Sequence, residues 1–155
     1  MTERQYTPQE VGAAIDAADK AYHALGIELL HAEPGYAKMS MKVRPDMLNC
    51  LGILHGGIMF TLADTSLALA ANVSNVVSYT YSSTIHFIAS ALVGEELISV
   101  TREDDTTTEG GKKSSRSGFY TTTVFGKNSR RIGVIQGVTR IVDKSVIETM
   151  REQNG

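Results

Sequence analysis

One carboxylate stands out because it lies inside a strongly apolar segment. Asp64 occupies the middle of the stretch Leu54–Asn72, whose sequence is LHGGIMFTLADTSLALAAN. This stretch predicts a buried helix, in which an ionised carboxylate is costly unless it is paired or hydrogen-bonded. Burial raises the pKa of such a group and hydrogen bonds lower it, so Asp64 could activate water as a general base or attack as a nucleophile. The alternative is a structural aspartate satisfied by neighbouring backbone groups.

The expected helix begins with two adjacent glycines, Gly56 and Gly57. Glycine is a poor helix former, by about 1 kcal/mol relative to alanine, and is useful where another group must approach the backbone closely. The first N–H groups of a helix have no internal partners and lie at the positive end of the helix dipole. They therefore suit an oxyanion that develops on a carbonyl group. The alternative is a turn with tight packing.

The spacing of these groups indicates where a site could lie. Asp64 follows Gly57 by roughly 10 Å along a helix that rises 1.5 Å per residue. One carbonyl group must contact both the oxyanion donors and the attacking water, each within about 3 Å. A single helix fits this requirement poorly, whereas two antiparallel copies could pair Asp64 of one with Gly57 of the other. The sequence thus favours a two-fold dimer with active sites at its interface.

The histidines do not suggest a metal site. His55 precedes the glycines and could act as a base at neutral pH, or it could orient the start of the helix. His86 alternates with polar residues of an expected strand and is expected at a surface or an interface. His23 and His31 lack metal-ligand spacing, so we predict no metal. The sequence also has no Gly-x-Ser-x-Gly elbow, dinucleotide-binding glycine pattern or phosphate loop.

The surrounding pattern predicts an α+β domain. Thr7 and Glu10 have the spacing of a capping box, so a helix is expected over residues 8–24. Because runs of strands follow a helix, an antiparallel sheet is favoured, and the simplest arrangement curves it around the apolar helix. We treat residues 1–155 as one domain with residues 1–24 as a helical extension. Strands are expected over 27–33, 36–44, 76–89, 95–103, 117–125 and 131–142, with a polar connection over 104–117 and a short helix from Ser145.

Composition narrows the classes of partner. Charged residues make up 21% of the chain and the net charge is −2, which predicts neither a nucleic-acid nor a membrane partner. Cys50 is the only cysteine and cannot form a disulfide within the chain. The first ten residues are polar and lack the apolar core of a signal peptide, so we expect a cytoplasmic protein.

The residues around the central helix resemble a known family. From Asn49 to Asp64 the chain reads N-x-x-G-x-x-H-G-G-x-x-x-x-L-A-D. This pattern is similar to that of the hotdog-fold acyl-CoA thioesterases of the phenylacetate-pathway type, and the similarity covers roughly residues 25–142. It implies a long central helix wrapped by a curved antiparallel sheet, and homodimers that pair into homotetramers.

The resemblance also assigns roles by position. Asp64 corresponds to the general base or nucleophile, and an N–H group of Gly56 or Gly57 polarises the thioester carbonyl. Asn49 helps to position the thioester or the water. A hydroxyl on the next strand corresponds best to Thr80, with Ser82 as its neighbour on the same face, and both are candidate substrate-binding residues.

The implied reaction is hydrolysis of an acyl-CoA to free acid and CoA, with CoA as part of the substrate and no other cofactor. Helical spacing places Phe60 or Thr61 on the face of Asp64, so both are candidate substrate-binding residues. Phe60, Tyr79 and Tyr81 could line an aromatic or aliphatic pocket or belong to the core, so the acyl group stays open. Basic residues of the polar connection could contact the CoA phosphates or lie in solvent: Lys112, Lys113 and Arg116.

The chain departs from the family pattern in two places, and two rival functions stay open. The proline that commonly follows the strand phenylalanine is replaced around Ser90–Ala91, and the 104–117 connection is longer and more polar. The first rival is a hotdog enoyl-CoA hydratase or dehydratase, which requires a histidine and an acidic group placed differently. The second is a non-catalytic acyl-CoA-binding protein on the same fold. Asp64 argues against it, since binding alone does not require a buried carboxylate.

Overall fold

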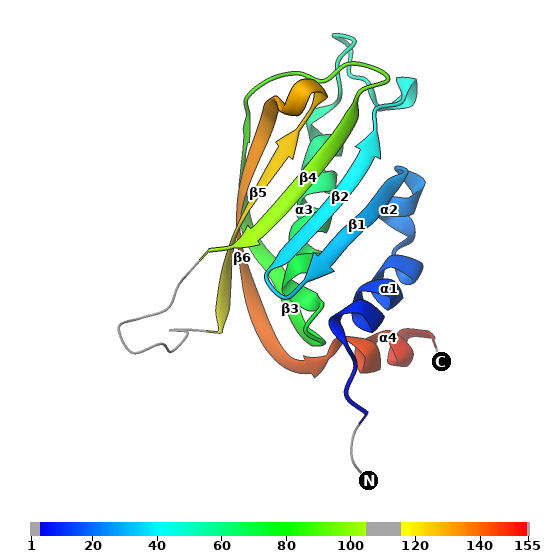
Figure 1. Cartoon of the computed structure of the whole chain (residues 1–155), viewed down its shortest axis with the longest axis vertical. Helices are drawn as coiled ribbons and strands as arrows, with labels where there is room; N and C mark the ends of the chain where they lie inside the picture. The colour runs from blue at the N-terminus through cyan, green and yellow to red at the C-terminus, as the bar shows by residue number, and fades with distance from the viewer. Residues whose placement is uncertain (1–3, 105–115, 155) are drawn as a thin grey trace.

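The computed structural model describes residues 4–104 and 116–154, in which a curved sheet wraps around a long helix (Figure 1). This helix, α3, spans Gly56–Asn72. The sheet has six strands in the order β1-β2-β4-β5-β6-β3 in the described part of the chain, and every neighbouring pair is antiparallel. The predicted α+β arrangement is therefore confirmed. The strands are β1 (Ile27–Glu33), β2 (Tyr36–Lys42), β3 (Val76–Phe87), β4 (Glu96–Glu103), β5 (Ser117–Phe125) and β6 (Arg131–Ser145).

The predicted helix over residues 8–24 forms as two helices instead of one. α1 covers Pro8–Ala18 and α2 covers Lys20–Ala24. Asp19 separates them because its carboxylate accepts hydrogen bonds from the N–H groups at the start of α2, including that of Ala21 at 3.0 Å. Aspartate is a favourable N-cap, and here the cap starts a new helix in place of continuing the old one. A last helix, α4, covers Val146–Asn154, and single 3₁₀ turns lie at Pro45–Met47 and Lys127–Ser129.

The start of α1 follows the prediction closely. The Thr7 hydroxyl accepts a hydrogen bond from the Glu10 N–H at 3.2 Å, and the Glu10 carboxylate accepts one from the Thr7 N–H at 2.9 Å. This reciprocal capping box satisfies two donors that a helix start otherwise leaves unpaired. The amphipathic extension thus has a fixed beginning.

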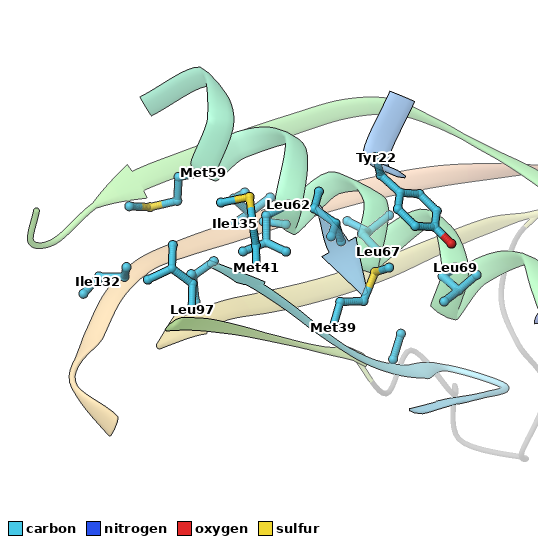
Figure 2. Packing of buried hydrophobic residues seen from close by; sticks show 14 of the residues in the cluster. Tyr22, Met39, Met41, Met59, Leu62, Leu67, Leu69, Leu97, Ile132 and Ile135 are labelled. Atoms are coloured by element: carbon cyan, nitrogen blue, oxygen red, sulfur yellow. The ribbon is translucent and has the colours of Figure 1, made fainter. Parts of the chain in front are cut away.

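The hydrophobic core lies between α3 and the concave face of the sheet (Figure 2). Leu62, Leu67 and Leu69 of α3 are at most 1% exposed. They pack with Met39 and Met41 of β2 and with apolar residues of β4 and β6. Because this one side of α3 is buried against the sheet, the opposite side of the helix is left available for chemistry.

Four strand ends differ from the predicted ranges. β3 ends at Phe87 instead of 89, and β4 begins at Glu96 instead of 95. β2 ends at Lys42 instead of 44; the N–H of Val43 still donates to the carbonyl of Glu95 at 2.9 Å, and a 3₁₀ turn then begins at Pro45. β6 continues to Ser145, beyond the predicted end at 142, because Ser145 pairs with Val76 at the start of β3. None of the helices in the described ranges is long and apolar enough to cross a membrane.

Candidate active site

Asp64 lies on the side of α3 that faces away from the sheet core, and its side chain is half-buried. Burial raises the pKa of the Asp64 carboxyl above its ordinary value. A hydrogen bond from the Thr80 hydroxyl opposes this rise, because it stabilises the charged form. Strand β3 thus supplies a hydrogen-bond donor to the carboxylate, and a role of Thr80 in substrate binding stays a prediction.

The prediction that Ser82 shares a face with Thr80 is wrong. Thr80 pairs with Thr139 of β6, whereas Ser82 pairs with Val138, so β3 carries one extra residue, Tyr81, between them. Such a bulge reverses the alternation of side chains beyond it. Ser82 therefore points to the outer face of the sheet, away from Asp64, and is exposed. The alternation in the sequence could not show this, because a bulge leaves no local pattern of its own.

The two glycine amides at the start of α3 are not equivalent. His55 is the N-cap of the helix, and its Nδ1 atom accepts a hydrogen bond from the Gly57 N–H at 3.0 Å. The N–H of Gly56 has no acceptor within the described residues. Of the two candidate donors, the one available to an incoming oxyanion is therefore Gly56. His55 orients the helix start, and the same bond fixes its remaining ring proton on Nε2.

An aromatic ring packs against Gly56. A Cβ atom built on Gly56 would lie 2.9 Å from Cζ of Phe87, so only glycine leaves room for the ring in its present position. Phe87 is itself 57% exposed. The helix start is thus an N–H group beside an apolar surface, an environment in which a hydrogen bond to an oxyanion is stronger than in water.

Asn49 lies in a tight turn that leads to this helix start. Its side-chain oxygen accepts hydrogen bonds from the N–H groups of Leu51 at 2.9 Å and Ile53 at 3.4 Å. Gly52 has a φ of +75°, in the left-handed region, and its N–H donates to the Asn49 carbonyl. The Asn49 oxygen is therefore used by the turn, while its NH₂ group has no acceptor among the described residues and can donate to a ligand.

The other predicted substrate-binding residues are placed less favourably. The Thr61 hydroxyl donates to the carbonyl of Gly57 one turn earlier at 3.0 Å, and Phe60 packs against the core. Arg116 forms an ion pair with Asp143. Lys112 and Lys113 lie outside the described residues. No cluster of metal-ligating side chains occurs within the described ranges.

Comparison with known proteins places the chain in a family. A model of the thioesterase superfamily matches residues 51–109. Human acyl-coenzyme A thioesterase 13 is 31% identical over 101 residues, which span 63% of this chain and 72% of the human protein. The chain belongs to the thioesterase superfamily. The predicted family is thereby confirmed, and the predicted enzyme class, thioester hydrolase, is that of the family.

Comparisons with two further proteins extend this result. The acyl-coenzyme A thioesterase PaaI of Escherichia coli is 27% identical over 119 residues, covering 77% of this thioesterase and 80% of PaaI. The structure of E. coli PaaI superposes with a TM-score of 0.81 at 23% identity, covering 89% of this chain and 95% of that one, which confirms the hotdog fold. A putative esterase of Archaeoglobus fulgidus is 35% identical over 85 residues, and the chain spans 55% of its length.

The sequence did not reveal the open groove that begins at Asp64 in this thioesterase. The groove has a volume of about 990 Å³ and lies between α1, α2, α4 and the outer side of α3. No local signal could have indicated it, because its walls come from the two ends of the chain. Its lining is Ala14, Ile15, Ala17, Ala18, Asp19, Lys20, Ala21, Asp64, Thr65, Ala68, Leu69, Asn72, Val146, Met150 and Gln153.

Proposed function

We propose that this thioesterase hydrolyses an acyl-CoA to free acid and CoA at sites shared between two copies of the chain. One observation carries the proposal. The half-buried carboxylate of Asp64 and the unpaired amide of Gly56 lie on one helix, about 12 Å apart at 1.5 Å per residue. This distance is too long for both groups of one copy to reach the same thioester carbonyl. Two copies solve the problem if Gly56 of one faces Asp64 of the other.

The edge of the sheet supports such a pairing. Among the described strands β3 has a neighbour on one side only, and it exposes Tyr79 by 58% and Tyr81 by 59%. A long exposed edge strand with aromatic side chains is a template for pairing with another strand. Antiparallel pairing of β3 with β3 of a second copy would bring the two α3 helices side by side, because each helix lies behind its own β3. Pairing of such dimers into tetramers stays a prediction.

The chemistry follows from these positions. The thioester oxygen accepts the Gly56 N–H of one copy, and the NH₂ group of Asn49 is a further donor for the thioester or the water. Water attacks the carbonyl carbon while Asp64 of the other copy takes its proton. The tetrahedral intermediate then collapses, the C–S bond breaks, and the proton returns to the CoA sulfur. Alternatively, Asp64 attacks directly and water hydrolyses the mixed anhydride. Neither route requires a cofactor beyond the CoA of the substrate.

The rival functions have weaker support. A hydratase would require a histidine as the base, yet the Nδ1 atom of His55 is engaged by Gly57. A pure binding protein would not require a half-buried carboxylate with its own hydrogen-bond donor.

The single exposed cysteine, Cys50, is consistent with the predicted reducing, cytoplasmic location.

Thiol release measured with short, long and aromatic acyl-CoAs tests the activity. We expect release by the wild type and by Asp46→Asn, a control at an exposed aspartate, and loss of release in Asp64→Asn and Asp64→Ala. Crotonyl-CoA hydration is followed in parallel. Hydration without thiol release would support the hydratase, and absence of both reactions would refute the proposal.

A mixing experiment tests whether the site is shared. Asp64→Asn keeps the Gly56 amide, and Gly56→Pro keeps the carboxylate but removes the N–H. A mixed dimer of the two variants has one site with both groups intact and one with neither. If subunits exchange at random, half of the dimers are mixed, and about one quarter of wild-type activity should return. Absence of any recovery, with subunit exchange verified, would show that each site lies within one copy.

A further inference from the structure

The groove beside Asp64 is built largely by parts of the chain outside the sheet. α1 and α2 form one wall, the outer side of α3 forms the floor, and α4 closes the far end. Figure 1 shows α1 and α2 along the side of the molecule next to β1, with α4 at the lower end. The groove therefore depends on the N-terminal extension and on the last helix.

The floor of the groove runs along one face of α3. Asp64, Ala68 and Asn72 follow each other at intervals of four residues and so lie in line on a helix. Asn72 at the far end is fully engaged, because its NH₂ group donates to the carbonyls of Ala68 and Ser78 and its oxygen accepts the Ser78 N–H at 2.9 Å. Of these two polar side chains, Asp64 is therefore the one that can contact a ligand.

Small apolar side chains make up most of one wall. Ala14, Ala17, Ala18 and Ala21 contribute only methyl groups from α1 and α2. The carboxylate of Asp19, which also lines the groove, is occupied as the N-cap of α2. The small side chains of this wall offer an apolar contact area for a ligand, while Lys20, Thr65 and Gln153 add polar groups to the lining.

We infer that this groove holds the acyl chain of the substrate, with the thioester at Asp64 and the methyl end directed toward α4. The inference rests on the proposed function and specifies its substrate class. Asp64 and Asn72 lie about 12 Å apart along the helix. An extended alkyl chain advances ~1.3 Å per carbon, given C–C bonds of about 1.5 Å, so this length fits about nine carbons. The preferred substrate is a medium-chain aliphatic acyl-CoA.

Met150 of α4 sets the end of the groove. Both Met150 and Ala14 also line an adjoining cavity of about 400 Å³, which lies between α1, α4 and the N-terminal segment. The methionine side chain thus stands between two spaces. A smaller residue there would join them and admit a longer chain.

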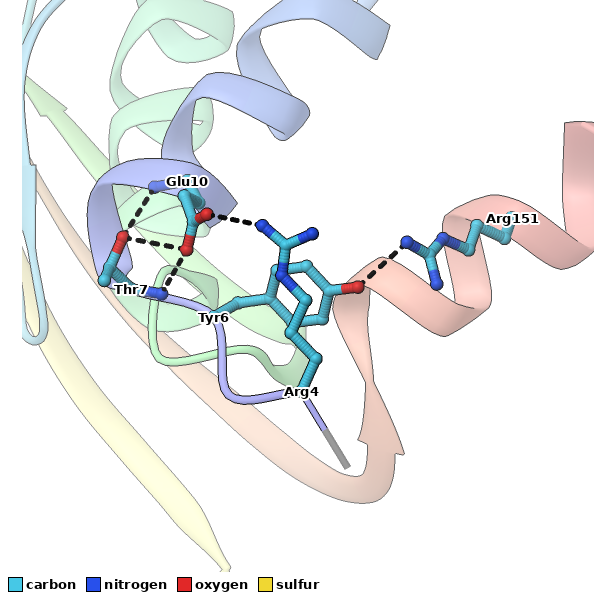
Figure 3. Close-up of polar contacts among 5 residues, drawn as sticks. All are labelled: Arg4, Tyr6, Thr7, Glu10 and Arg151. Atoms are coloured by element: carbon cyan, nitrogen blue, oxygen red, sulfur yellow. Dashed lines mark hydrogen bonds and ion pairs between the residues drawn. The ribbon is translucent and has the colours of Figure 1, made fainter. Parts of the chain in front are cut away.

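The two ends of the chain are tied together around this cavity (Figure 3). The Tyr6 hydroxyl accepts a hydrogen bond from Arg151 of α4 at 2.8 Å. The guanidinium of Arg4 lies 5.0 Å from the centre of the Tyr6 ring and donates to Glu10 at 2.8 Å. These contacts hold α1 against α4, so the wall and the end of the groove keep a fixed separation.

Two substitutions of opposite effect test the inference. Ala21→Phe fills the groove, so the ratio of kcat/KM for decanoyl-CoA to that for butyryl-CoA should fall at least threefold. Met150→Ala should shift the best substrate to a chain that is longer by two or more carbons. Ala13→Phe and Ala24→Phe are matched controls, because both alanines are exposed on the same helices and do not line the groove. A chain-length profile of Ala21→Phe equal to those of the controls would overturn the inference.

Binding separates this inference from the proposed activity. Calorimetric titration of Asp64→Asn should show tighter binding of decanoyl-CoA than of CoA, and adding Ala21→Phe should abolish only that difference. Absence of thiol release from every acyl-CoA would refute the activity, whereas equal binding of CoA and decanoyl-CoA would refute the groove as the acyl site. Sedimentation of Ala21→Phe tests whether a second copy of the chain occupies the groove instead of an acyl chain. Loss of self-association without a change in chain-length preference would assign the groove to a second copy and overturn the inference.

Discussion

Replacing Gly56 with proline would remove one hydrogen-bond donor from the start of α3 and leave the helix intact. Gly56 is the first residue of the helix, and its N–H has no acceptor within the described residues. Proline is favoured at this first position because its missing N–H is unpaired there in any case. The residue before a proline must be extended, and His55 already has a φ of −63° and a ψ of 131°. The substitution therefore tests the amide and not the fold.

The expected loss of activity can be set against a matched variant. Removing one oxyanion donor costs about 10²- to 10³-fold in kcat, which corresponds to about 2.7–4 kcal/mol. Gly56→Ala keeps the N–H and adds the same Cβ, which would lie 2.9 Å from Cζ and 3.0 Å from Cε1 of Phe87. Because that ring is 57% exposed, it can move aside. The steric cost is thus common to both variants, and we expect Gly56→Ala to lose only a few-fold in activity.

The assay is steady-state thiol release with the best acyl-CoA, accompanied by thermal unfolding of each variant. Gly56→Pro should lose at least 30-fold more activity than Gly56→Ala, with the loss in kcat, while both variants unfold within a few degrees of the wild type. Equal activities of the two variants would refute the assignment of the Gly56 amide as the oxyanion donor. Equal and large losses would instead point to the contact with Phe87.

Three further predictions follow from the same site. Thr80→Val removes the hydrogen bond that lowers the Asp64 pKa, so the acid limb of the pH–rate profile should move to higher pH, whereas Ser82→Ala should leave it unchanged. Because burial raises the pKa of Asp64 in the folded state, the folded protein binds its proton more tightly than the unfolded chain and stability falls as pH rises through this range. Asp64→Asn should therefore raise the melting temperature at neutral pH, and a gain that persists below the pKa of an unfolded aspartate would contradict this cause. His55→Ala removes the N-cap of α3 and should lower the free energy of unfolding by about 1 kcal/mol in denaturant titrations, with the Gly57 N–H left unpaired.

Local patterns in the sequence were sufficient for several features. The capping box at Thr7, the start of the central helix at Gly56 and the strand over residues 117–125 all appear where they were predicted. Each depends on groups within a few residues of one another, such as a hydroxyl and an amide three positions apart. The carboxylate at Asp64 was also predictable, because a charged residue inside an apolar segment can be recognised from the sequence alone.

Other features depended on which of several compatible partners or registers the folded chain adopts. The capping of α2 by Asp19, the bulge at Tyr81 and the bond from Gly57 to His55 are each compatible with the sequence, but so are their alternatives. The bulge decides which of Thr80 and Ser82 meets Asp64, and the histidine decides which glycine amide is free. The strand register is set by pairing with β6, far along the chain, whereas the histidine lies only two residues from Gly57 and the fold decides how its ring is turned.

The sequence by itself placed a carboxylate and a glycine helix start on one segment with a fixed rise between them, and the resemblance of that segment to the acyl-CoA thioesterases indicated the kind of chemistry. Only the tertiary structure decided which individual atoms can take part and where an acyl chain could lie. The groove beside Asp64 shows the reason, because its walls join residues of α1 and α4 from opposite ends of the chain. Their proximity is produced by burial of apolar side chains around the edge of the sheet, and a pattern along the sequence does not contain it.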